Sequence, residues 1–179
     1  MADITLSSGS HVKPYRTPWG AFHVRHYEVS TGVSSAAIQV GRIVTLDAST
    51  NGHRVKASTA VGAFNTVGIA GEALSTATVG VTTVPVYEAN PLQEFSAYTK
   101  GGALVDTLVG SARTLQFDST LNIHWVDNAA STAADNRVLV TQLLDNIGDT
   151  GGRVAFRFLP NFTAPSTLVS SNAFLAFYR

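Results

Sequence analysis

The chain has 179 residues, enough for one domain with a proper core and too few for two ordinary domains. Charged residues make up only 13% of it, and its twelve acidic and twelve basic side chains cancel, which disfavours nucleic acid as a partner. Cysteine is absent, so disulfides, thiolate metal sites and cysteine nucleophiles are excluded. With 16 Ser and 20 Thr against three Lys, the composition favours strands and turns over surface helices.

Residues 1–35 are predicted to form an extended N-terminal arm. Pro14 and Pro18 disfavour regular helix and central-strand pairing, and large aromatic side chains occur here with few aliphatic neighbours. These rings either fold back onto the domain or lie on a neighbouring subunit, where aromatic anchors concentrate binding energy. No basic start is followed by an apolar run and no stretch of 18 apolar residues occurs, so we expect neither a secretory signal nor a spanning helix.

Residues 36–160 are predicted to form one compact β-domain, which begins with a hairpin. GRIVTLD and RVKA, residues 41–47 and 54–57, alternate around a turn of small polar residues. VGIAGEA, residues 67–73, has side chains small enough for close packing on both faces. Such a strand is typical of a position beneath another sheet or in a tight barrel.

The second half of the domain continues the β pattern. Further strands are predicted over residues 82–89, 94–99 and 121–127, and in a final hairpin formed by 137–145 and 153–159. Pro85 indicates that its strand is an edge strand or contains a bulge. Helical periodicity is limited to a weak candidate at 130–144, so we expect a nearly all-β fold, a β-barrel or a β-tulip or sandwich-like domain. Residues 161–179 are predicted to be an extended C-terminal tail.

Period-two placement predicts which apolar side chains form the core. In the last predicted strand, Val154, Phe156 and Phe158 share one face, with Arg153 and Arg157 on the other. By the same alternation, the expected core residues are Ile43, Leu46, Val55, Ile69, Val84, Val86, Leu121, Ile123, Trp125, Val138, Val140, Val154, Phe156 and Phe158.

The loop GDTGG, residues 148–152, is similar to the GDSGG around the nucleophile of trypsin-like serine proteases. Thr150 occupies the position of the serine, the TAAHC histidine motif is missing, and the chain is shorter than that double barrel requires. We therefore interpret the loop as a turn whose glycines adopt positive φ between two strands. Asp149 is expected to support this turn by accepting hydrogen bonds from local backbone N–H groups.

The other reactive side chains occur singly along the chain. His23 and His26 are the only histidines at short range, and on an extended chain their spacing places them on opposite faces, which disfavours a metal site. A pair of carboxylates such as Glu72 and Glu88 could still meet in space. We expect no catalytic residue, no cofactor and no metal site, and therefore no enzyme.

The stretches GRIVTLD, RVKA and VGIA, residues 41–47, 54–57 and 67–70, resemble the strand-turn-strand of capsid decoration (cement) proteins of tailed bacteriophages. VPVYEANPLQEFSAYTKGG, DTLVGSA and DNIGDTGGRVAFRF are similar to segments of phage virion proteins, so the likeness covers roughly residues 38–159. The matched features are glycines and small apolar residues rather than catalytic motifs.

The resemblance implies a small β-barrel or β-tulip domain, commonly a homotrimer, that clamps neighbouring major capsid proteins. Its implied place is the exterior of the virion capsid, after synthesis in the host cytoplasm. The implied partners are the major capsid protein and other copies of the chain, with no nucleic acid and no membrane. We expect the two ends of the chain to make the assembly contacts, because extended segments can seat rings in a neighbour's pockets. The residues expected there are Tyr15, Trp19, Phe22, Tyr27, Phe174, Phe177 and Tyr178.

A second interpretation is a β-sandwich binding module of a phage fibre or similar appendage, which would recognise a carbohydrate or a receptor. Trp19, Trp125, Tyr87 or Tyr98 would then form a stacking platform. Soluble glycans distinguish the two interpretations, because a clamp should ignore them. A hydrolase is a third interpretation, and it would require two carboxylates that face each other across a cleft.

Overall fold

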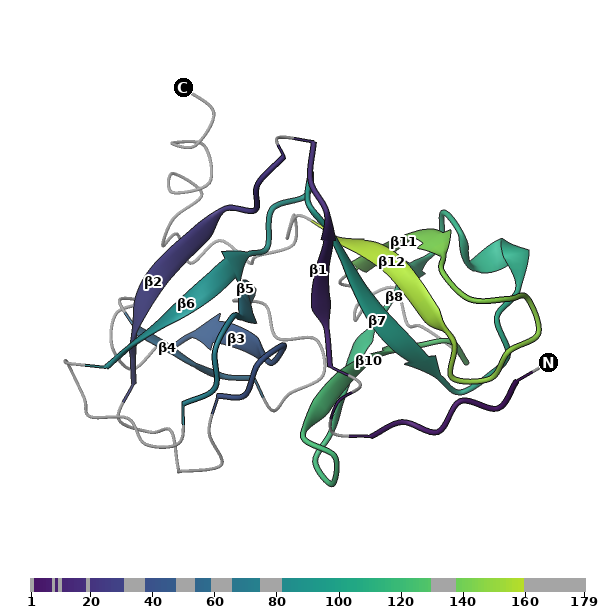
Figure 1. Cartoon of the computed structure of the whole chain (residues 1–179), viewed down its shortest axis with the longest axis horizontal. Coiled ribbons are helices and arrows are strands. Elements are labelled where there is room, and N and C mark those ends of the chain that lie inside the picture. Colours follow the sequence, from purple (N-terminus) through teal and green to yellow (C-terminus); the bar gives the residue numbers. More distant parts are fainter. Residues whose placement is uncertain are drawn as a thin grey trace, which may run out of the picture.

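The computed structural model describes residues 2–7, 9, 11–18, 20–30, 38–47, 54–58, 66–74, 82–129 and 138–159. These residues are nearly all β, as predicted, and the helical part among them is the short 3-10 turn η2 (Asp106–Leu108). The strands form two units that lie side by side, a closed barrel and a larger sheet (Figure 1).

The barrel contains five strands and closes on itself in the order β2-β4-β3-β5-β6. Its strands are β2 (Val24–Val29), β3 (Ile43–Leu46), β4 (Arg54–Ala57), β5 (Thr66–Ala70) and β6 (Thr83–Glu88). The predicted hairpin of residues 41–47 and 54–57 is confirmed, because β3 and β4 pair antiparallel with Leu46 opposite Val55. β5 pairs with the other side of β3, and the parallel pairing of β2 with β4 closes the ring.

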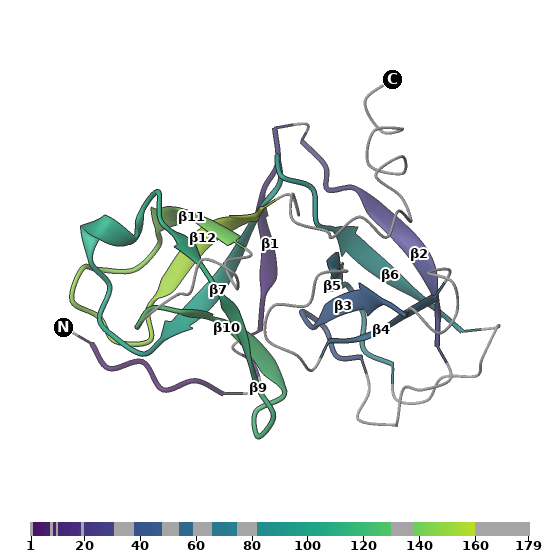
Figure 2. The same ribbon diagram turned by 180° about the vertical axis from the view of Figure 1, so that it is seen from behind.

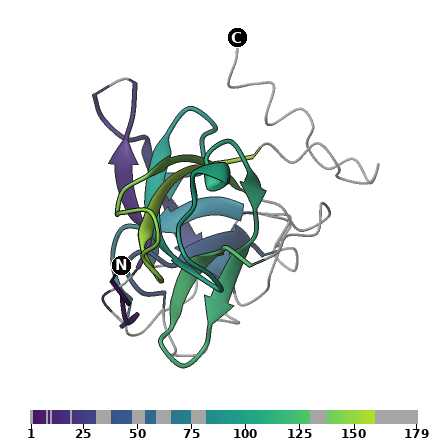
Figure 3. The ribbon, with the colours of Figure 1, turned by 90° about the vertical axis from the view of Figure 1, so that its right-hand side faces the viewer.

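The second unit is a seven-stranded sheet in the order β8-β11-β12-β7-β10-β9, with β1 paired to β7 beside this path. Its strands are β1 (Lys13–Arg16), β7 (Glu94–Lys100), β8 (Ala112–Arg113), β9 (Leu115–Asp118), β10 (Ile123–Asp127), β11 (Val138–Leu143) and β12 (Arg153–Phe158). The pairing is antiparallel except between β10 and β7. The sheet is strongly curved when viewed from its end (Figure 3).

The chain enters the sheet, builds the barrel and then returns to the sheet. β1 belongs to the sheet, the barrel is formed from β2 to β6 in one continuous run, and β7 leads back into the sheet. Two strands, β1 and β2, lie within residues 1–35, the predicted arm. This part of the predicted arm folds back onto its own chain, with β1 in the sheet and β2 in the barrel.

Two hydrophobic clusters stabilise the units. The smaller one fills the barrel with side chains such as Val44, Val55 and Ala70. The larger one lies inside the sheet and also contains Ile43 and Ile69. β3 and β5 therefore have apolar side chains buried on both faces, inward in the barrel and outward against the sheet. The small side chains of residues 67–73 predicted a strand packed on both faces, and β5 confirms this prediction. The barrel wall thus lies directly against the sheet (Figure 2).

Eleven of the fourteen predicted core side chains are buried, and Leu46, Leu121 and Trp125 are only half-buried. Two of these three, Leu121 and Trp125, lie just before or on β10, whose main core contact comes from Val126. His124 shares the face of Val126, and both are buried, as is Ile123 on the predicted face, so the expectation that this strand is buried on one face only is wrong. The alternation of Leu121, Ile123 and Trp125 is real, but the second face of β10 meets the barrel and is buried as well.

Two turn predictions have different outcomes. The glycines of the 148–152 loop behave as expected, with φ of 91° at Gly148 and 70° at Gly151. The prediction that Pro85 marks an edge strand or a bulge is wrong, because β6 pairs on both sides in the closed barrel. In an antiparallel pair, the N–H and the C=O of one residue point to the same neighbouring strand. The Pro85 carbonyl accepts from the Gly71 N–H just after β5 ends, so the N–H that Pro85 lacks would also lie beyond the end of β5. Its absence therefore removes no bond from the β5–β6 ladder.

Candidate interaction surface

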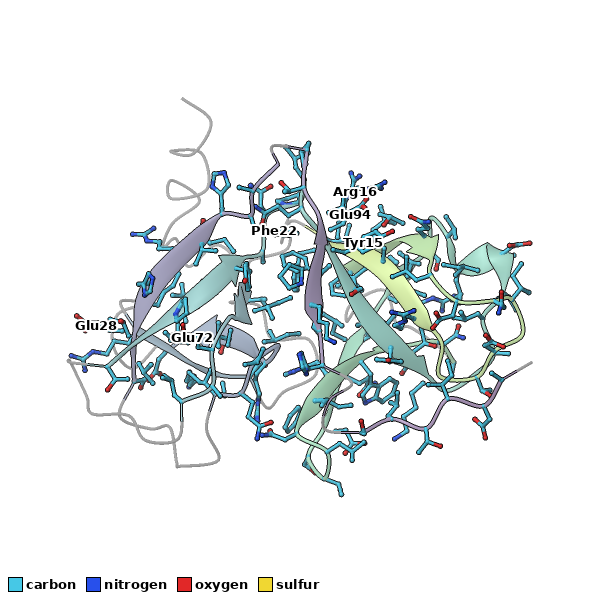
Figure 4. All side chains as sticks on the ribbon, in the orientation of Figure 1. Tyr15, Arg16, Phe22, Glu28, Glu72 and Glu94 are labelled. Carbon is cyan, nitrogen blue, oxygen red and sulfur yellow. The ribbon has the colours of Figure 1, made fainter. Side chains whose placement is uncertain are left out.

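The reactive side chains of the described residues do not gather into a metal site. No group of three or more His, Asp or Glu side chains that could hold a metal ion occurs in these ranges. His23 precedes β2 and His26 lies on it, and both are exposed. Glu88 accepts a hydrogen bond from the Tyr27 hydroxyl at 2.9 Å, whereas Glu72 is exposed in the turn after β5 (Figure 4).

The GDTGG loop binds the N-terminal residues of its own chain. Asp149 accepts a hydrogen bond from the Asn146 N–H at 3.2 Å, which confirms its predicted role in the turn, and another from the Ala2 N–H at 2.6 Å. The Thr150 hydroxyl donates to Asp3 at 3.1 Å, and its backbone N–H donates to the Ala2 carbonyl at 3.0 Å. The hydroxyl and the backbone N–H of Thr150 thus both donate hydrogen bonds to the N-terminal residues.

The predicted assembly contacts are placed very differently from one another. Tyr15 on β1 is 41% exposed. Phe22 is half-buried in an aromatic group, with its ring centroid 5.8 Å from that of Tyr87 and 5.7 Å from that of Phe95. Tyr27 is also half-buried, and burial, together with its hydrogen bond to Glu88, raises its pKa to about 12. Trp19, Phe174, Phe177 and Tyr178 lie outside the described residues.

Beside Tyr15, two arginines converge on one buried carboxylate. Glu94 begins β7, and its side chain is only 2% exposed. Arg16 of β1 donates to Glu94 Oε2 from Nε at 2.8 Å and lies 2.7 Å from it through Nη2. Arg157 of β12 donates to Glu94 Oε1 from Nε at 3.1 Å and from Nη2 at 2.8 Å. Figure 4 shows Tyr15, Arg16 and Glu94 together at this end of β7.

This Arg–Glu–Arg cluster determines the charge that solvent meets at this end of β7. Both carboxylate oxygens of Glu94 are occupied, so Glu94 is held as a structural ion pair. The two guanidinium groups remain in contact with solvent, with side chains 60% exposed at Arg16 and 40% exposed at Arg157. Two cations surround one buried anion, so the cluster presents a net positive charge in a fixed position.

A second polar cluster lies where the barrel meets the sheet. Arg42, just before β3, is 4% exposed, and its guanidinium carbon lies 4.1 Å from the ring centroid of Phe117 on β9. It also donates to the Asn122 side chain and, at 3.2 Å, to the Ser58 carbonyl. Among the described residues no carboxylate pairs with Arg42, and burial lowers the pKa of its guanidinium. The ring and neutral oxygen atoms therefore stabilise this cation.

His124 completes the contact between the barrel and the sheet. Its Nδ1 accepts a hydrogen bond from the Ile43 N–H at 3.4 Å, and within the described ranges its Nε2 has no hydrogen-bond partner. Burial, followed by the nearby Arg42 charge, lowers the pKa of His124 to about 3. The imidazole is therefore neutral at neutral pH and acts here as a packed hydrogen-bond acceptor.

Two of the aromatic residues considered for a stacking platform share a face of the sheet. Lys100 places its Nζ 5.4 Å from the ring centroid of Trp125, and Tyr98 lies on the same face of β7 as Lys100. Both Trp125 and Tyr98 are half-buried. Tyr87 does not belong to this face, because it packs against Phe22.

The sequence contained only part of the information needed to find the Arg–Glu–Arg cluster. Arg157 was predicted to point away from the core of its strand, whereas the pattern assigned no face to Glu94. Their meeting depends on the pairing of β12 with β7, and Arg16 joins them only because β1 pairs with the other side of β7. These are long-range contacts that alternation alone does not specify.

Comparison with known proteins identifies no relative of this chain. No protein-family model matches the sequence, and no match is found among curated proteins or among solved structures. Among the described residues, no helix is long and apolar enough to cross a membrane.

Proposed function

We propose that the chain is a structural virion protein that decorates a bacteriophage capsid and stabilises it by clamping neighbouring major capsid proteins. The observation that carries this proposal concerns residues 41–47, 54–57 and 67–70, whose sequence resembles capsid decoration proteins. They form β3, β4 and β5, three adjacent strands of a closed barrel. A small barrel is the fold that the resemblance implies.

The contacts of the described polar residues support a structural role. Thr150 and Asp149 hold the N-terminal residues, Glu94 holds three strands together, and Arg42 and His124 join the two units. Each is engaged in a contact that makes the molecule rigid. A rigid body suits a clamp, because a preformed contact surface loses little entropy on binding.

Co-sedimentation with empty phage heads tests the proposal. Expanded heads of the encoding phage, free of the native protein, should carry the purified chain into the pellet at a saturating and reproducible ratio to major capsid protein. Unexpanded heads serve as the control, because their lattice has a different spacing. Equal and unsaturable pelleting with both kinds of head, or none with expanded heads, would contradict the proposal.

The carbohydrate- or receptor-binding module remains a second candidate because of one observation. Trp125 and Tyr98 lie on one outward face of β10 and β7, near the exposed Lys100. Titration with soluble glycans separates the two functions. A glycan that binds the chain and is lost with Trp125→Ala would support the module, whereas a clamp should show no heat of binding.

A further inference from the structure

The outward face of β1, β7 and β12 is dominated by cations. On these three strands the charged residues are Lys13, Arg16, Glu94, Lys100, Arg153 and Arg157, five cations and one anion. The strand register places them on one face, because Lys13 is opposite Ser96, Arg16 is opposite Glu94 and Arg153 is opposite Tyr98. We call this surface, formed by the five cations with Tyr15 and Tyr98, the cationic face.

Ion pairing compensates the charge of this face only in part. Arg16 and Arg157 share Glu94, whose side chain is 2% exposed. Lys100 pairs with Asp118, and Arg153 pairs with Asp145, whose side chains are 15% and 17% exposed. The four cations in these pairs are 40% to 60% exposed. Glu94 is buried, and Asp118 and Asp145 are less exposed than the cations that they pair with.

The pairing also fixes the cations in place before any partner binds. Arg16, Arg153 and Arg157 each use Nε and Nη2 on their carboxylate, so the ion pair limits the rotation of the guanidinium. Among the described residues no hydrogen bond engages the Nη1 atom of any of the three. Each arginine thus keeps donors for an incoming carboxylate, and little side-chain entropy remains to be lost.

The chemistry of the face favours a protein partner over nucleic acid. Arg153 and Arg157 are four residues apart on one strand, roughly 13 Å at about 3.3 Å per residue. Double-stranded DNA carries a charge about every 1.7 Å along its axis, a density that these separated and partly compensated cations do not match. Tyrosine and arginine together are typical of protein interfaces, and Tyr15 and Tyr98 provide the aromatic part.

We infer that the cationic face is the surface with which this chain docks on an acidic patch of a protein partner. The inference rests on the proposed function in one respect, namely that the partner is the major capsid protein of the shell. Carboxylates of the partner would meet the free guanidinium donors, with Tyr15 packing at the edge of the contact. Charge complementarity of this kind speeds association and selects the orientation of the bound chain.

A charge reversal at Lys13 tests the inference with little risk to folding. Lys13 is exposed, and no ion pair within the described ranges involves it. The matched control is Arg25→Glu, which changes the net charge equally at an exposed position on β2 of the barrel. We expect Lys13→Glu to weaken binding to expanded empty heads by roughly tenfold, and the wild-type affinity to fall with salt. Arg25→Glu should bind within about twofold of the wild type.

A second readout decides the inference without the shell. On a surface coated with poly-L-glutamate at pH 7, the wild type should be retained at low salt, and Lys13→Glu should elute at lower salt than Arg25→Glu. Equal elution of the two variants, or no retention of the wild type, would overturn the inference. If heads bind the wild type but both variants bind equally well, the docking face is elsewhere although the proposed function stands.

Double-stranded DNA serves as the alternative probe. If the wild type binds DNA at physiological salt, loses this binding with Lys13→Glu and ignores poly-L-glutamate, the face recognises nucleic acid and the acidic-protein assignment is wrong. If heads fail to bind while the poly-L-glutamate result holds, the proposed function fails but the cationic face remains a docking surface for acidic proteins.

Discussion

His124 should make the stability of this protein depend on pH over an unusually wide acidic range. Its pKa is lowered from 6.5 to about 3 by burial and, secondarily, by the Arg42 charge. In the unfolded chain the imidazole takes up a proton below pH 6.5, whereas the folded chain excludes that proton until about pH 3. The unfolded state therefore binds more protons across this window, and the free energy of unfolding falls as the pH is lowered.

The size of the effect follows from the shift. One pKa unit corresponds to about 1.4 kcal/mol, so His124 contributes roughly 4 to 5 kcal/mol of stability that is fully present above pH 6.5 and lost by pH 3. The expected slope is about 1.4 kcal/mol per pH unit between these limits. Below pH 3.8 the loss becomes steeper, because hydrogen bonds and ion pairs lower the pKa of Asp118 and Asp145.

Urea denaturation of the wild type and of His124→Asn between pH 4 and pH 6 measures this contribution. The asparagine oxygen can accept the Ile43 N–H but does not titrate in this range, so it serves as the matched reference. The unfolding free energy of the wild type, relative to that of His124→Asn, should fall by about 1.4 kcal/mol for each unit by which the pH is lowered. Parallel pH profiles would refute the reasoning, because they would mean that His124 accepts a proton equally well in the folded state.

Three further outcomes are expected. Phe156→Ala should destabilise the protein by about 3 to 5 kcal/mol in chemical denaturation, since Phe156 is 0% exposed and packs against Phe95 and Phe158; a loss under about 1 kcal/mol would contradict the assigned core. Gly68→Ala should reduce the free energy of unfolding by about 1 to 3 kcal/mol and lower the thermal midpoint, because the added Cβ would lie 2.0 Å from the Tyr87 carbonyl oxygen. An unchanged midpoint would contradict this close approach. In an ultraviolet pH titration, Tyr27→Phe should remove a phenol that ionises near pH 12, and loss of an ordinary phenol instead would contradict the burial of Tyr27.

The sequence was sufficient for the fold class and for most of the core. Alternation around residues 48–53 predicted the β3–β4 hairpin, and the small side chains of residues 67–73 indicated a strand packed on two faces. Both signals are local, because they depend on side-chain period and size. The burial of His124 could not be predicted in the same way, since both faces of β10 are covered once the barrel packs against the sheet.

The candidate site was predictable only in fragments. Alternation placed Arg157 away from the core, and Tyr15 was expected to be available for contacts. Neither observation indicated that Arg16 and Arg157 would share Glu94, because residues 78 and 63 positions apart meet only through strand pairing. The balanced net charge concealed the cationic face for a related reason, since composition does not record which partner of an ion pair is buried.

Cryo-electron microscopy of expanded heads incubated with the chain tests the central claim most directly. The account predicts additional two-unit density on the outer surface, at symmetry-related positions where neighbouring major capsid proteins meet, with the face of Lys13, Arg16 and Arg157 turned toward the shell. Heads whose outer surface is unchanged at saturating concentrations of the chain would contradict a decorating function.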